Sequence, residues 1–204
     1  RELSLEVSVD REGAQRFHDT RRLSVFPPLA LEAPGVAVGL HDPTGATKAV
    51  LARNGLTLRD VPDLAAIPND LAVLVLGDGA LQPQQEATVV VGSRPGAQGG
   101  LSEFIREGGR VLALPQTHYP PELGGVTLSG HASPMTFAQM PGHPLLQAVL
   151  EDELKFWAPD NIVTQAEAFR PTQGGFEAVV VSGSAAGIDH APLLVRPIGS
   201  GVLL

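Results

Sequence analysis

Apolar and polar residues alternate along the first part of the chain, and this period of two predicts β-strands. The clearest case is residues 3–9 (LSLEVSV), which a turn signal (DREG) follows at 10–13. A second strand is expected over 21–26, where the pattern ends at consecutive prolines. Because a lone two-stranded hairpin is at best marginally stable, we expect residues 1–28 to be the last hairpin of a preceding β-sandwich domain. The alternative is that this hairpin pairs with the rest of the chain.

The middle of the chain contains short runs that are apolar at every position, a pattern typical of parallel strands covered by helices on both faces. These runs are residues 36–40, 71–76 and 110–114. Helical spacing predicts one helix over 45–54, which Gly55 ends, and another over 101–107. Strands and helices that alternate in this way predict an α/β domain with a doubly wound, mostly parallel sheet over residues 29–204.

The last third of the chain is richer in strand patterns and poorer in helical ones. Strands are expected at 124–128, 162–168, 176–182 and 193–204, with at most a short helix over 145–150. Residues 80–97 have no clear period, and we expect part helix and part loop there. Because the final strand pattern is still apolar at residue 204, we expect the α/β domain to be truncated at its C-terminus.

Composition and charge exclude several classes of function. A chain of 204 residues with 43% hydrophobic residues can bury a sizeable core, so we do not expect disorder. The net charge of −8 disfavours a nucleic-acid partner, and no apolar run is long enough to predict a membrane span. The absence of cysteine excludes disulfides, thiolate zinc sites and cysteine nucleophiles, but it assigns no cellular compartment.

Polar residues follow the predicted parallel strands at their carboxyl ends, where open α/β sheets bind ligands. A small polar ligand such as a sugar would therefore be held by Asp42, Asp78, Gln116, Thr117 and His118. This gives one alternative function, that of a binding module.

Two short segments have partial hydrolase signatures. Residues 183–187 (GSAAG) resemble a nucleophile elbow, but Ser184 is preceded two positions earlier by Ser182 where that motif needs glycine. In the pair Asp189-His190, a carboxylate could orient an imidazole for base catalysis. Adjacent side chains in an extended segment point to opposite sides, however, so we expect this pair to lie in a surface loop. A serine or histidine hydrolase is a further alternative.

The sequence predicts no cofactor or metal. No two of the six histidines are three to five residues apart, as metal-binding pairs on a helix or turn would be. Residues 77–82 (GDGALQ) follow a predicted strand as a dinucleotide fingerprint does, but Gln82 replaces its third glycine. A P-loop motif is absent from the sequence.

Two segments resemble the first half of a class I glutamine amidotransferase-like domain. They are residues 74–81 (LVLGDGAL) and 101–114 (LSEFIREGGRVLAL). The resemblance implies a flavodoxin- or amidotransferase-like doubly wound sheet, with an elbow after residue 114 that carries the nucleophilic cysteine in active members. Here the elbow is Pro115-Gln116, and proline also removes an N–H that could hold an oxyanion. The catalytic function of the family is therefore not expected.

Degenerate domains of this kind occur as accessory modules, trimerisation domains among them, in bacterial glycoside hydrolases. Residues 142–146 (GHPLL) and 154–157 (LKFW) resemble segments of such modules in enzymes similar to β-galactosidases and β-glucuronidases. The resemblance implies a non-catalytic domain of a larger glycoside hydrolase that acts in carbohydrate metabolism. Its expected partners are neighbouring domains of the parent chain, or further copies in a homo-oligomer.

Overall fold

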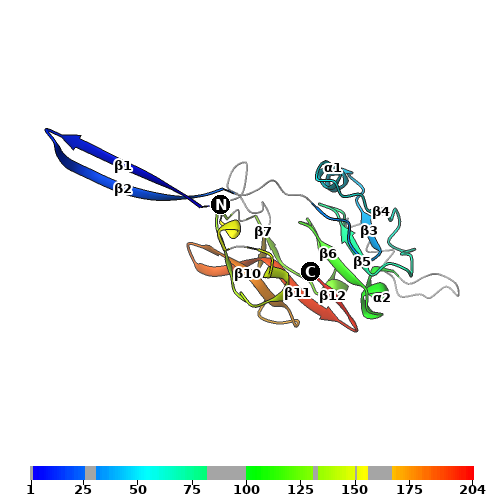
Figure 1. The fold of residues 1–204 in the computed structure, drawn as a ribbon. Coiled ribbons are helices and arrows are strands. Elements are labelled where there is room, and N and C mark those ends of the chain that lie inside the picture. Colours follow the sequence, from blue (N-terminus) through cyan, green and yellow to red (C-terminus); the bar gives the residue numbers. More distant parts are fainter. Residues whose placement is uncertain (1, 26–30, 82–99, 131–132, 150, 156–166) are drawn as a thin grey trace. The chain divides into compact units, whose positions relative to one another are not determined.

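The computed structural model describes residues 2–25, 31–81, 100–130, 133–149, 151–155 and 167–204 (Figure 1). These residues form two compact units, Arg1–Ala30 and Leu31–Leu204. The predictions for residues 82–97 and 162–166 lie outside the described residues, as does the segment 156–157 of the family resemblance.

The first unit is a β-hairpin. Strand β1 (Glu2–Arg11) pairs antiparallel with β2 (Ala14–Ser24). The turn has positive φ at Glu12 (57°) and Gly13 (76°), the combination that a tight hairpin turn requires. Strand β2 begins seven residues before the position predicted from its hydrophobic pattern, because the turn sets the register and main-chain pairing extends the strand through polar residues.

The second unit is mixed α/β, and half of its sheet is parallel. Strands β4, β3, β5, β6 and β12 lie side by side in that order, and each neighbouring pair is parallel. Their bounds are Val38–His41 for β3, Arg59–Asp60 for β4, Val73–Leu76 for β5, Arg110–Ala113 for β6 and Gly201–Leu203 for β12. Helix α1 (Ala46–Arg53) follows β3, and helix α2 (Leu101–Arg106) precedes β6. The strands predicted at 36–40, 71–76 and 110–114 and the helices predicted at 45–54 and 101–107 are therefore confirmed.

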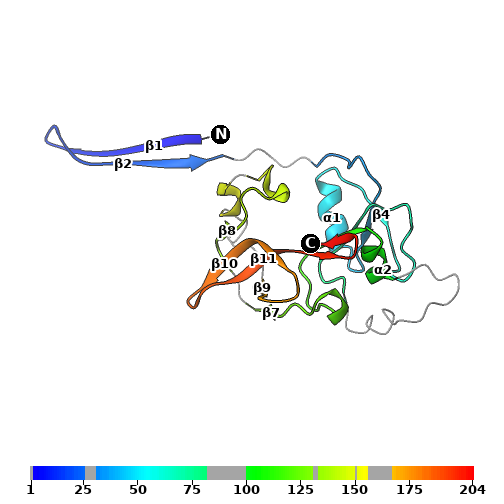
Figure 2. The ribbon, with the colours of Figure 1, turned by 90° about the horizontal axis from the view of Figure 1, so that it is seen from below.

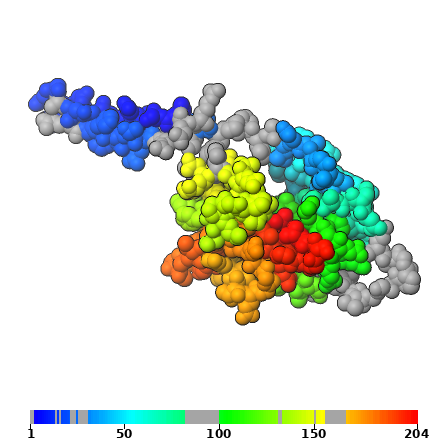
Figure 3. Space-filling model, turned by 60° about the horizontal axis from the view of Figure 1, so that its bottom comes forward, coloured from blue at the N-terminus to red at the C-terminus, as the bar shows by residue number. Residues whose placement is uncertain are grey.

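The main core lies between α2 and the parallel strands. Leu74 and Leu76 of β5 are fully buried and pack in one cluster with Ile105 of α2. Truncating one such leucine would cost about 2–5 kcal/mol of stability. Strand β12 passes so close to α2 that a Cβ at Gly201 would overlap the carbonyl oxygen of Ile105. In the space-filling view, the red C-terminal residues lie directly against the green residues of α2 and β6 (Figure 3).

The other half of the sheet is antiparallel, and β11 joins the two halves. The end of β11 (Gly187–Ile198) pairs with β12, and its beginning pairs with β10 (Glu177–Ser184) and β9 (Glu167–Phe169) (Figure 2). The remaining strands are β8 (Thr136–Ala138), beside β10, and β7 (Leu128–Ser129), beside β9. The sheet of the described residues is therefore mixed, whereas the sequence predicted a mostly parallel one.

Several predictions for the last third were wrong because glycines interrupt apparently regular patterns. The expected strand at 124–128 is interrupted by positive φ at Gly124 and Gly125, which follow the 3-10 helix η2 (Pro121–Leu123), and strand β7 begins only at Leu128. The expected single strand at 193–204 is divided by a turn at Gly199, where φ is 63°. Glycine adopts this conformation at no steric cost, so the chain reverses there.

The other short helices described in this region are also of the 3-10 type. They are η3 (Pro144–Leu146), within the range where a short helix was predicted, and η4 (Glu151–Leu154). No helix in the described part of the chain is long and apolar enough to cross a membrane.

Candidate functional site

Asp42, which follows β3, has its carboxylate at the beginning of α1. Oδ2 accepts the main-chain N–H of Lys48 at 2.8 Å, and Oδ1 accepts the Thr44 hydroxyl at 3.0 Å. A Cβ at Gly77 would lie 2.7 Å from Oδ1, so the carboxylate rests against the backbone that follows β5. Unpaired N–H groups make a helix N-terminus attractive to anions. In this chain, the protein's own carboxylate takes that position.

Asp78, which follows β5, is held through its backbone. Its N–H donates to Oγ1 of the buried Thr47 in the first turn of α1, at 3.0 Å, while its side chain is exposed. This bond connects α1 to the end of β5. The two carboxyl groups predicted at this edge, those of Asp42 and Asp78, therefore follow neighbouring strands and give this edge negative charge.

Gln116, in the bend after β6, cross-links the ends of two strands. Its side chain is 2% exposed. Nε2 donates to the carbonyl oxygens of Gly77 at 2.8 Å and of Leu114 at 2.5 Å, and Oε1 accepts the N–H of Leu81 at 2.8 Å. Both amide hydrogens and the amide oxygen are thus used within the protein.

The other residues predicted at this edge are more accessible. Pro115 is exposed, and its carbonyl oxygen accepts the N–H of Gly79 at 2.9 Å. Thr117 is exposed and His118 is half-buried. The structure therefore brings Asp42 and Gln116 together at Gly77, and both side chains bind backbone groups of the protein.

A second polar cluster lies in the antiparallel half of the sheet. Nδ1 of His190 is 2.7 Å from Oδ1 of Asp189, and Nε2 is 3.1 Å from Oγ of Ser129. Because a carboxylate only accepts hydrogen bonds, Nδ1 carries a proton, and neutral imidazole then accepts the Ser129 hydroxyl hydrogen at Nε2. The ring of Phe169 lies beside the imidazole at a centroid distance of 4.8 Å.

The prediction of a surface loop at Asp189-His190 is wrong, since both residues lie inside β11 and His190 is 3% exposed. The β10–β11 register shifts beside this pair: Ser182 faces His190, but Ser184 faces Gly187. The extra residue makes a bulge that turns neighbouring side chains out of strict alternation. Ser129 comes from β7, and the sequence contained no signal for it.

Asp189 is oriented from two sides. Partial desolvation raises its pKa, but hydrogen bonds from His190 and Ser184 outweigh this and leave the pKa below its usual value. The Ser184 hydroxyl donates to Oδ2 at 3.0 Å. Ser184 thus positions a carboxylate and does not stand at a nucleophile elbow.

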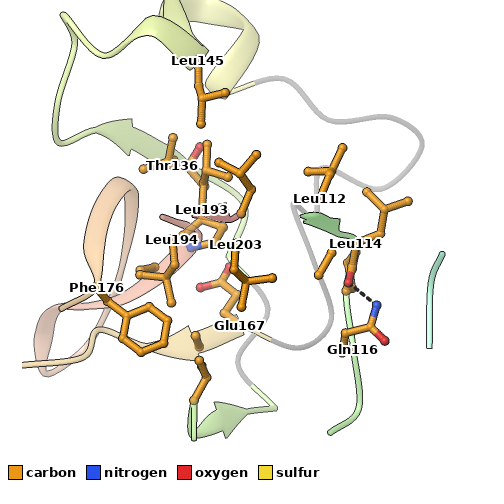
Figure 4. A pocket seen from close by; sticks show the side chains of 18 of the residues that line it. Leu112, Leu114, Gln116, Thr136, Leu145, Glu167, Phe176, Leu193, Leu194 and Leu203 are labelled. Atoms are coloured by element: carbon orange, nitrogen blue, oxygen red, sulfur yellow. Dashed lines mark hydrogen bonds between the residues drawn. The ribbon is translucent and has the colours of Figure 1, made fainter. Parts of the chain in front are cut away.

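A cavity of about 520 Å³ opens between the two halves of the sheet (Figure 4). Leucines from β6, the bend after it, β11, β12 and η3 make up much of its described lining: Leu112, Leu114, Leu193, Leu194, Leu203 and Leu145. Glu167 of β9 also lines it and is 1% exposed. Its Oε2 accepts a hydrogen bond from Ser182, while Oε1 has no hydrogen-bond partner among the residues that the structure describes. Sequence reasoning missed Glu167, because only the tertiary structure shows that it is buried.

Within the residues that the structure describes, no three His, Cys, Asp or Glu side chains gather as a metal site would require. The chain matches no protein-family model, and it is not significantly similar to any curated protein or solved structure.

Proposed function

We propose that this chain is a degenerate class I glutamine amidotransferase-like domain that serves as a non-catalytic packing module of a larger bacterial glycoside hydrolase. The strand order supports the fold: counted along the chain, the parallel strands lie in the order 2-1-3-4-5, which is that of doubly wound flavodoxin-like sheets. Strand β6 lies inside this sheet, between β5 and β12, and Pro115-Gln116 follow it at the position where the resemblance implies an elbow.

The side chain of Gln116 is the observation that carries the proposal. A nucleophile must expose a reactive atom at the elbow. Gln116 offers a buried amide whose hydrogen-bonding groups all bind backbone. This arrangement stabilises the corner between β5 and β6 and provides no group that could attack a substrate.

Side chains of the protein also fill the space at the carboxyl ends of β3 and β5, where doubly wound sheets bind ligands. Asp42 satisfies the beginning of α1, and Thr47 binds the N–H of Asp78. A phosphate or carboxylate ligand would have to displace Asp42 and approach two carboxylates. This favours a packing role over ligand binding at Asp42, Asp78, Gln116, Thr117 and His118.

Exposed apolar side chains in each unit support the packing role. In the hairpin they alternate along β1, at Leu3, Leu5, Val7 and Val9. In the second unit they lie between residues 135 and 149, at Met135, Phe137, Met140, Leu145 and Val149. Exposed apolar surface of this kind is typical of sites that pack against another domain or subunit.

The test uses the full-length protein that contains this chain, with and without residues 31–204. We expect the deletion to lower the melting temperature of the neighbouring domains, or to change the number of subunits measured by analytical ultracentrifugation, because an apolar interface is lost. An unchanged melting temperature together with an unchanged number of subunits would overturn the proposal.

The hydrogen-bonded series Asp189–His190–Ser129 favours a second candidate function, ester hydrolysis. In this scheme, Oγ of Ser129 bonds to the ester carbonyl carbon while its proton moves to Nε2 of His190. The proton then passes to the departing alkoxide, and water releases the acyl group by the same route in reverse. Asp189 stabilises the imidazolium that forms in each step.

Hydrolysis of p-nitrophenyl acetate and labelling by a fluorophosphonate probe test this second function. Ser129→Ala is expected to abolish labelling and time-dependent hydrolysis. The matched control is Ser184→Ala, which removes a different hydroxyl that also donates within the cluster, and it should still be labelled. Absence of labelling in the unsubstituted protein would exclude the function.

A further inference from the structure

The cavity between the two halves of the sheet carries an inference beyond the packing role. We propose that it is a binding site for a small organic amine, whose apolar body fills the leucine-lined space and whose ammonium group pairs with Glu167. The volume of about 520 Å³ lies within the range of small-molecule sites.

The polar atom that points to a ligand is Oε1 of Glu167. Buried polar atoms in folded proteins almost always have a partner, and a buried carboxylate without one is costly. Glu167 is 1% exposed, the Ser182 hydroxyl binds its Oε2, and no described residue binds its Oε1. In Figure 4 the carboxyl group lies among the labelled leucines Leu194 and Leu203, on the lining of the cavity. A donor on a ligand would therefore complete the hydrogen bonding of this carboxylate.

The charged side chains of the lining favour a positively charged ligand. Glu153 and Glu167 are the acidic side chains among the described lining residues, which include no lysine, arginine or histidine. Tyr119 also lines the cavity, and burial raises its pKa to about 12, so its hydroxyl stays neutral. An ammonium group is attracted to this lining, a neutral alcohol is not, and a carboxylate is repelled.

The apolar side chains of the lining favour a ligand with an apolar group of moderate size. Apart from a few polar side chains, the described lining is aliphatic with one phenylalanine, Phe176. Arg196 stacks on the ring of Phe176 at 5.1 Å but is not one of the described lining residues. A ligand with an aromatic or aliphatic group next to its amine would bury that group here.

The probes are three indole compounds of similar shape and different charge: tryptamine, tryptophol and indole-3-acetate. In isothermal titration of the purified chain at neutral pH, tryptamine is expected to bind about tenfold or more tightly than tryptophol, as a charge-assisted hydrogen bond would give. Indole-3-acetate is expected not to bind. Equal affinity for the three compounds, or no binding of tryptamine at millimolar concentration, would overturn the proposal.

Two substitutions locate the site. Glu167→Gln keeps the shape of the side chain and removes its charge, so the preference for tryptamine over tryptophol should disappear. The matched control is Glu177→Gln, which changes an exposed acidic residue outside the described lining and should retain the preference. A preference that survives Glu167→Gln would overturn the assignment. If Glu167→Gln does not fold, Ala191→Leu, which narrows the cavity, must weaken binding of tryptamine and tryptophol alike.

Discussion

The amide nitrogen of Gln116 lies 2.8 Å from the carbonyl oxygen of Gly77, so the bend after β6 is fastened to the end of β5. Gly77 also lies against the carboxylate of Asp42, which follows β3. The ends of neighbouring parallel strands, where open α/β sheets bind ligands, are thus held together by side chains that bind backbone.

Replacing Gln116 by alanine should destabilise the domain by about 1–3 kcal/mol, because buried backbone groups of Gly77, Leu81 and Leu114 lose their partner. Urea unfolding followed by circular dichroism measures the change. Thr117→Ala, at the exposed neighbouring position, is the control and should stay within about 0.5 kcal/mol. Equal stability of the two variants would contradict the structural role of Gln116.

Three of the five parallel strands, β3, β5 and β6, could be predicted from the sequence because they are short apolar runs, whereas the two-residue strand β4 is exposed and has no such pattern. A run such as 71–76 is apolar throughout, and glycines mark the ends of the adjacent helices. The antiparallel half was harder, because its strands contain polar residues on buried faces. His190 and Glu167 are polar yet almost fully buried, and no local pattern distinguishes them from exposed residues.

The candidate site divides in the same way. Asp42, Asp78 and Gln116 were predicted because each follows an apolar strand, and strand ends of a parallel sheet meet at one edge. Ser129 and His190 come together only through pairing of β9 with both β7 and β11. Such pairing joins residues that are far apart in the chain, and the register between β10 and β11 shifts at three places, which no local pattern predicts.

Asp42→Ala should destabilise the domain by about 1 kcal/mol, since the first turn of α1 loses the acceptor for the Lys48 N–H. Asp78→Ala is the matched control, because only the backbone of Asp78 bonds to α1 and its side chain is exposed. Thermal unfolding of both variants distinguishes them. A larger loss in the Asp78 variant would show that the two carboxylates have been assigned the wrong roles.

Gly201→Ala should prevent close packing of β12 on α2, because the added Cβ would overlap the carbonyl oxygens of Ile105 and Gly109. We expect a loss of about 3 kcal/mol or more, as for other overpacked cores. Gly142→Ala is the control: no atom lies within 4 Å of the Cβ it would add. Differential scanning calorimetry should show a large decrease in melting temperature for the first variant alone.

The stability of the domain should depend on Asp189 at acid pH. Its pKa is lowered from 3.8 in the folded state, so the unfolded chain binds a proton more readily. The contribution of Asp189 is therefore complete above pH 3.8 and is lost as the pH falls through its folded pKa. Urea unfolding at a series of pH values checks this, and Asp189→Asn should show a shallower decrease in stability than the unsubstituted chain.

Ammonia release from glutamine by the purified chain tests most directly whether Gln116 has a structural or a catalytic role. If the role is structural, neither the unsubstituted chain nor Gln116→Ala should release ammonia above the buffer blank at any protein concentration. Release that is linear in time, proportional to protein and lost in Gln116→Ala would contradict the account.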